Sequence, residues 1–230
     1  PAMARAYGRG SHSGLDRLLP DAVRLFSALG FAIAALGSVV SPGLVDLLYG
    51  SRYAGAVVAV QVSLVAAGIG LLSAPMNAYQ TTADRQAQRV VITGSVLAIN
   101  GIVALLLVPE FGLEGALWSL LITSVSNVAI SVAALRRTSI VRLPYGACGR
   151  LALSALLAWG GAIAVTELVR FRFEFVIGGL MFIVLYAAIS IVVGCWNRAD
   201  FHLAASLLER MGAQRAASAV RWVGQRAGSK

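Results

Sequence analysis

The chain has 230 residues, of which 58% are hydrophobic and only 13% are charged, and its net charge is +9. Soluble domains carry about 25% charged residues, so this composition excludes an ordinary water-soluble domain and indicates a protein embedded in a bilayer. The basic charge does not indicate nucleic-acid binding, because the Lys and Arg residues lie between apolar runs and not on one folded basic face.

Six apolar runs follow one another along the chain, and each could cross a bilayer as one helix. A hydrocarbon core about 30 Å thick requires roughly 20 apolar residues, and in lipid a helix satisfies its backbone N–H and C=O groups internally. We therefore predict an all-α integral membrane protein with six transmembrane helices, at 24–41, 54–76, 90–108, 115–135, 151–169 and 174–196.

Proline and glycine punctuate these runs. Ser41-Pro42-Gly43 is expected to end the first helix, since proline cannot continue the hydrogen-bond ladder. Pro75 is expected to end or kink the second helix. Pro109 and Gly112 are expected to bracket a short turn after the third.

The cations predict the orientation of the chain. If the amino terminus lies inside, the segments on the inner side hold sixteen of the nineteen Lys and Arg residues. The outer segments hold only Arg52, Arg170 and Arg172. This distribution follows the positive-inside rule, so both termini are expected in the cytoplasm.

Several stretches resemble one family in their order and spacing. Residues 42–54 read P-G-L-V-D-L-L-Y-G-S-R-Y-A, and residues 77–85 read N-A-Y-Q-T-T-A-D-R, with a short basic turn at their end. Residues 99–116 read I-N-G-I-V-A-L-L-L-V-P-E-F-G-L-E-G-A, and residues 1–5 read P-A-M-A-R. Together they resemble the polysaccharide-transport branch of the multidrug/oligosaccharidyl-lipid/polysaccharide exporter superfamily, the Wzx-type lipid-linked oligosaccharide flippases.

The resemblance implies a two-lobed helical bundle around a central cavity, of which this chain is the carboxyl-terminal part. Residues 1–23 would be the cytoplasmic end of a preceding helix or loop, and 24–137 four transmembrane helices of the second lobe. Residues 138–196 would form a loop and a terminal transmembrane hairpin. Residues 197–230 have the pattern of a cytoplasmic amphipathic basic helix and tail.

The resemblance also implies a function. Such a protein moves polyprenyl-linked oligosaccharide units across the bacterial inner membrane by alternating access, for O-antigen or exopolysaccharide synthesis. Its partners would be membrane lipid, the lipid-linked oligosaccharide and polysaccharide polymerase or assembly proteins. Two alternatives stay open: a small-molecule or drug exporter of the same superfamily, and a membrane scaffold subunit of a polysaccharide assembly complex. No catalytic constellation, cofactor motif or metal-ligand spacing is recognisable, so we do not expect an enzyme.

Polar residues inside the apolar runs are the candidate substrate contacts. In a membrane such residues cost free energy unless they form hydrogen bonds or face a water-filled cavity. Amide side chains suit sugars since they both donate and accept hydrogen bonds, although bonds between helices are the competing explanation. The candidates are Gln61, Asn77, Tyr79, Gln80, Asn100, Ser126 and Asn127. Arg85 and Arg89 are candidates for a phosphate or lipid headgroup, with topology and anionic lipid contact as the alternative.

Overall fold

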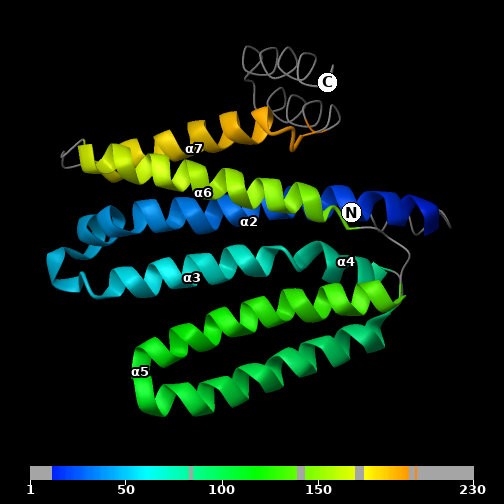
Figure 1. Cartoon of the computed structure of the whole chain (residues 1–230). Coiled ribbons are helices and arrows are strands. Elements are labelled where there is room, and N and C mark those ends of the chain that lie inside the picture. The colour runs from blue at the N-terminus through cyan, green and yellow to red at the C-terminus, as the bar shows by residue number, and fades with distance from the viewer. Residues whose placement is uncertain (1–11, 83–84, 139–142, 169–173, 197–199, 201–230) are drawn as a thin grey trace.

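The computed structural model describes residues 12–82, 85–138, 143–168, 174–196 and 200. Within these ranges every regular element is a helix, which confirms the all-α prediction (Figure 1). The elements are α2 (His12–Tyr49), the short 3-10 helix η1 (Ser51–Tyr53), α3 (Ala56–Leu71), α4 (Ala74–Thr82), α5 (Gln86–Thr138), α6 (Tyr145–Leu168) and α7 (Glu174–Val192). The predicted terminal basic helix and the 1–5 motif lie outside the described residues.

Five stretches of the described chain are long and apolar enough to cross a membrane. α3 and α4 together supply one of them, Ala56–Thr82, and the other four lie in α2, α5, α6 and α7. These five candidate spans support a multi-pass membrane protein.

α5 folds back on itself near its middle. Gly112 has φ 55° and ψ −124°, which interrupts the helical path, and the two arms run side by side (Figure 1). A Cβ atom at Gly115 would meet the backbone carbonyl of Leu107 across this bend, so the close approach requires glycine. The turn predicted after the third apolar run is therefore confirmed, with Pro109 still inside the helix. We call 86–111 the first arm of α5 and 113–138 the second.

Pro42 does not end the first helix, so that prediction was wrong. α2 runs through it to Tyr49, and it also begins early, so that residues 12–23 are continuous with the first apolar run. Proline removes the N–H that would reach the carbonyl four residues earlier, which here belongs to Ser38. Gln61 of α3 supplies the missing bond, since its Nε2 donates to the Ser38 oxygen at 2.9 Å.

α2 is the helix that the rest of the bundle shares. On one side it packs in a core with α6 and α7, in which Leu151, Phe182 and Tyr186 are buried. On the other side its amino-terminal part packs with α4 and the second arm of α5, around the buried Met76 and Leu135. Figure 1 shows α2 lying between α3 and the α6–α7 pair.

A glycine pair brings α2 and α3 into close contact. A Cβ atom built on Gly30 would meet the carbonyl oxygen of Gly68, and one built on Gly68 would meet the carbonyl oxygen of Gly30. Small residues at such crossings let helix backbones approach within van der Waals distance, which is the main attraction between helices in lipid. Gly30 and Gly68 therefore set how closely α2 and α3 can pack.

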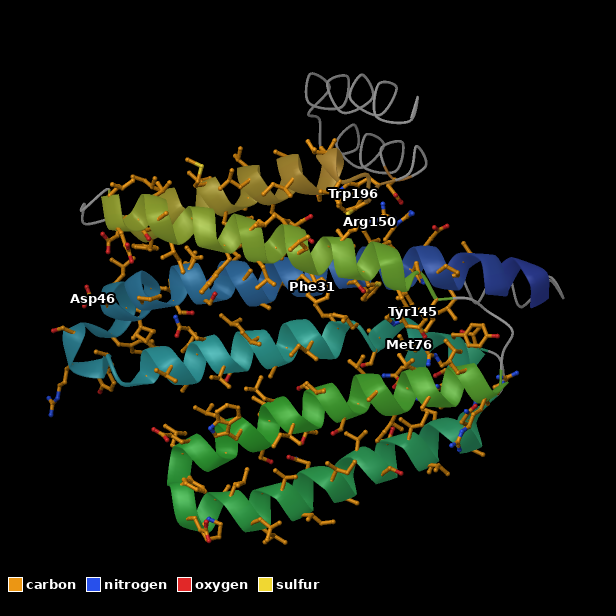
Figure 2. The ribbon with its side chains drawn as sticks, viewed as in Figure 1. Phe31, Asp46, Met76, Tyr145, Arg150 and Trp196 are labelled. Atoms are coloured by element: carbon orange, nitrogen blue, oxygen red, sulfur yellow. The ribbon has the colours of Figure 1, made fainter. Side chains whose placement is uncertain are left out.

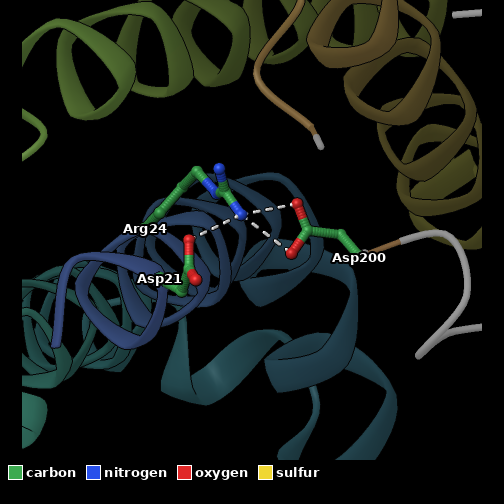
Figure 3. A network of polar contacts seen from close by, with 3 residues as sticks. All are labelled: Asp21, Arg24 and Asp200. Carbon is green, nitrogen blue, oxygen red and sulfur yellow. Dashed lines mark hydrogen bonds and ion pairs between the residues drawn. The ribbon is translucent and has the colours of Figure 1, made fainter. Parts of the chain in front are cut away.

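An ion pair joins α2 to Asp200, which follows α7 in the chain. Arg24 is only 8% exposed, and its Nη2 donates to both carboxylate oxygens of Asp200, at 2.9 and 2.7 Å (Figure 3). Asp21, one turn earlier in α2, lies 3.2 Å from the same nitrogen. Beside this pair, Arg150 of α6 donates to the carbonyl oxygen of Val193 at 3.3 Å.

The two ends of the bundle differ in charge. Figure 2 shows Asp46 at one end, and Arg150 with Tyr145 at the other. The end with Arg150 also holds the Arg24 ion pair, and there Arg136 donates to the Tyr145 hydroxyl at 2.9 Å. We call this the arginine-rich end. The opposite end holds the acidic residues that flank the Gly112 bend and begin α7, namely Glu110, Glu114 and Glu174.

The glycine crossing yields a prediction with an internal control. Gly68→Ala places a methyl group against the carbonyl of Gly30 and should destabilise the protein by about 1–3 kcal/mol through overpacking. Gly70→Ala, two residues along in α3, meets nothing within 4 Å and should leave stability unchanged or raise it. Thermal unfolding of the purified protein, followed by tryptophan fluorescence, checks both. Equal shifts for the two variants would contradict the crossing.

Candidate functional site

The predicted cavity residue Gln61 has a structural partner. It is half-buried on α3 and its amide satisfies the carbonyl that Pro42 leaves open in α2. An unpaired carbonyl would be costly in a hydrocarbon environment, so this hydrogen bond accounts for an amide at this position without any ligand.

Asn127 plays a similar part at the break between α3 and α4. Pro75 lies in the first turn of α4, and the chain bends at Ser73 just before it. The Ser73 hydroxyl donates to the carbonyl of Gly70 at 2.7 Å, and Asn127 Nδ2 on the second arm of α5 donates to the Ser73 hydroxyl at 3.0 Å. The kink expected at Pro75 is therefore present, and it is braced from the facing helix.

Asn100 joins the two arms of α5. Its Oδ1 accepts hydrogen bonds from Ser119 Oγ at 2.9 Å and from Thr123 Oγ1 at 3.0 Å. Both hydroxyls lie on the second arm, one turn apart. Asn100 thus holds the hairpin closed, as expected for interhelical polar contacts in membranes.

Gln80 differs from these three amides. Its side chain is 1% exposed, yet neither its Nε2 nor its Oε1 has a hydrogen-bond partner. Nη1 of Arg85 is also buried without a partner, and the Arg85 backbone N–H donates to the Gln80 carbonyl at 2.9 Å. A buried polar atom without a partner costs about 1–3 kcal/mol. Within the part of the chain that the structure describes, this end of α4 therefore carries buried polar atoms that are not satisfied.

Ser131 is another buried polar residue of this kind, and it was not among the candidates predicted from the sequence. It is fully buried on the second arm of α5, and its hydroxyl has no partner. Two contacts bracket it on that arm: Asn127 binds Ser73, and Gln88 Nε2 donates to the Ala134 carbonyl at 3.3 Å. Ser131 follows Asn127 by four residues and so shares its helix face, which is the signal that could have identified it. We call Gln80, Arg85 and Ser131 the unpaired polar group.

The remaining predicted residues do not form one wall. Tyr79 is buried in the apolar core between α2, α4 and α5. Asn77 is half-buried on α4, where its backbone carbonyl accepts a bond from Thr81 at 2.9 Å. Ser126 is half-buried on the second arm of α5. The structure thus brings Gln80 and Arg85 together but places Gln61 and Asn100 at separate helix contacts.

Arg89 lies on the outside of the same end. It is exposed, and its Nη1 donates to Thr81 Oγ1 at 2.6 Å. It lines an open groove of about 560 Å³ that follows the first arm of α5. Arg85 and Arg89, predicted as one phosphate site, therefore point to different surroundings, one half-buried beside Gln80 and one at this groove.

The chain was compared with known proteins. No family model, curated protein or solved structure matches it.

The difference between the unpaired amide of Gln80 and the paired amide of Asn100 can be tested by measuring the free energy of unfolding. Gln80→Leu removes two unpaired buried atoms and should raise the unfolding free energy, by up to a few kcal/mol. Asn100→Leu removes the acceptor that joins the arms of α5 and should lower it by roughly 0.6 kcal/mol. Unfolding in denaturing detergent, followed by circular dichroism, measures both. A destabilised Gln80→Leu variant would show that the Gln80 amide is paired after all.

Proposed function

We propose that this chain is the later part of a flippase that moves polyprenyl-linked oligosaccharide units across a bacterial inner membrane. The observation that carries the proposal is the order of the family-like motifs from 42–54 to 99–116. Residues that carry the resemblance also make the contacts that shape the helical framework: Pro42 at the Gln61 bond, Asn100 at the hairpin contact, and Gly112 and Gly115 at the bend.

In this proposal each arm of α5 crosses the membrane separately, which makes six crossings with both chain ends in the cytoplasm. The length of α5 supports two crossings, because 53 residues of helix would extend about 80 Å if straight, far beyond a bilayer core of about 30 Å. The arginine-rich end would then face the cytoplasm, in agreement with the positive-inside rule.

Under alternating access, the packed helices and the unpaired polar group would have different roles. The packed helices α2, α3, α6 and α7 would move as one body about the substrate site. Among the described residues, the buried side-chain atoms without a hydrogen-bond partner belong to Gln80, Arg85 and Ser131. A guanidinium donates to phosphate oxygens, and amide and hydroxyl groups bind sugar hydroxyls. We therefore assign the substrate headgroup to this unpaired polar group as it enters from the cytoplasm.

The transport proposal predicts a chemical phenotype. Cells that lose the protein should accumulate lipid-linked oligosaccharide on the cytoplasmic leaflet and lose surface polysaccharide, and the intact gene should restore export. Gln80→Leu should restore less export at an equal protein level, whereas Gly70→Ala should restore it fully.

Drug sensitivity without lipid-linked intermediates would favour a small-molecule exporter. Unchanged transport with loss of a bound synthase would favour a scaffold.

The topology can be tested by single cysteines in a background without Cys148 and Cys195. Gln86 and Ser51 are both exposed; Gln86 begins α5 at the arginine-rich end, and Ser51 begins η1 at the opposite end of the bundle (Figure 1). Cysteine at position 51 should react with an impermeant maleimide added to intact spheroplasts, and cysteine at position 86 should react only after lysis. Labelling at position 86 in intact spheroplasts would exclude this orientation.

A further inference from the structure

The groove along the first arm of α5 changes character along its length. Thr81, Gln86 and Arg89 form its polar end, at the start of the helix. Val90, Gly94 and Leu97 continue it as a mostly apolar channel, in which Thr93 is the one further polar side chain of the groove. Polar groups therefore gather at the level of the helix end, and apolar groups extend from there toward the middle of the arm.

Gly94 provides the space in the apolar part. It is exposed, and a Cβ atom built on it would meet nothing within 4 Å. From Gln86 to Leu97 the helix rises about 17 Å, close to the roughly 15 Å of hydrocarbon in one leaflet. The groove thus has the length of a single acyl chain in one leaflet, with its polar end at the headgroup level.

The polar end is suited to an anion. Arg89 uses one of its five donors on Thr81, and among the described residues neither Arg85 nor Arg89 forms an ion pair with a carboxylate. Both arginines flank the first turn of α5, where the helix dipole also favours negative charge. The electrostatic field at this end is therefore positive and uncompensated within the described chain.

We propose that this groove binds an anionic phospholipid of the surrounding bilayer, with the phosphate at Arg89 and one acyl chain along Gly94. A helix of a partner protein is the less suitable occupant, because it offers no match for a groove that is cationic at one end and apolar along the rest. The inference does not depend on the transport proposal, and lipid binding can be measured without transport.

The test is native mass spectrometry of the purified full chain, offered phosphatidylglycerol and phosphatidylcholine with identical acyl chains. The wild-type protein should retain phosphatidylglycerol preferentially. Arg89→Gln should reduce that retention about fivefold, since one cation near the surface contributes about 1 kcal/mol. Arg52→Gln, which removes a cation outside the groove, is the matched control and should leave retention unchanged.

A second pair of variants tests the acyl chain. Gly94→Leu fills the groove and should lower the retention of phosphatidylglycerol, whereas Gly101→Leu, two turns along the same arm and equally free of neighbours, should not. The unfolding temperature of each variant confirms that it is folded.

Three results would overturn the proposal. Equal losses for Arg89→Gln and Arg52→Gln would show attraction to surface charge alone. Equal retention by Gly94→Leu and Gly101→Leu would show that no acyl chain occupies the groove. Complete displacement of the lipid by millimolar inorganic phosphate, or a second copy of the protein in its place, would identify a different occupant.

Discussion

A single freed carbonyl constrains how this helical bundle can be built. Pro42 cannot donate to the carbonyl oxygen of Ser38, and lipid offers that oxygen no water. Gln61 closes this gap from α3, so α2 continues unbroken to Tyr49. Because α2 contributes to both buried cores and also carries the Gly30–Gly68 crossing, the positions of the other helices depend on its path.

The same requirement separates structural polar residues from candidate functional ones. Gln61 bonds the carbonyl that Pro42 leaves free, Asn127 braces the bend before Pro75, and Asn100 holds the α5 hairpin. Their hydrogen bonds are used within the fold, so they account for their own presence in apolar segments. Gln80 is more deeply buried than these three amides, and both polar atoms of its side chain are unpaired. An unpaired buried amide is a net cost to stability, which makes it the better candidate for a role in binding.

Much of the helical framework could be predicted from residue order, because apolar runs of membrane length leave the backbone few alternatives. The bend at Gly112 was also predictable from proline and glycine spacing. The path through Pro42 was not, since it depends on Gln61, nineteen residues away on another helix. For the same reason the sequence locates the polar residues within the apolar runs but cannot separate structural residues from candidate binding residues. Gln61 and Gln80 have identical side chains, and only their neighbours distinguish them.

A double-mutant cycle between Pro42 and Gln61 tests this account most directly. In the wild-type background, Gln61→Leu should lower the unfolding free energy by about 1–3 kcal/mol, because the Ser38 carbonyl loses its partner. In a Pro42→Ala background the alanine N–H can donate to that carbonyl, so Gln61→Leu should have little effect. A coupling energy near the full cost of the single variant is the predicted result. The same loss in both backgrounds would show that Gln61 does not compensate for the proline.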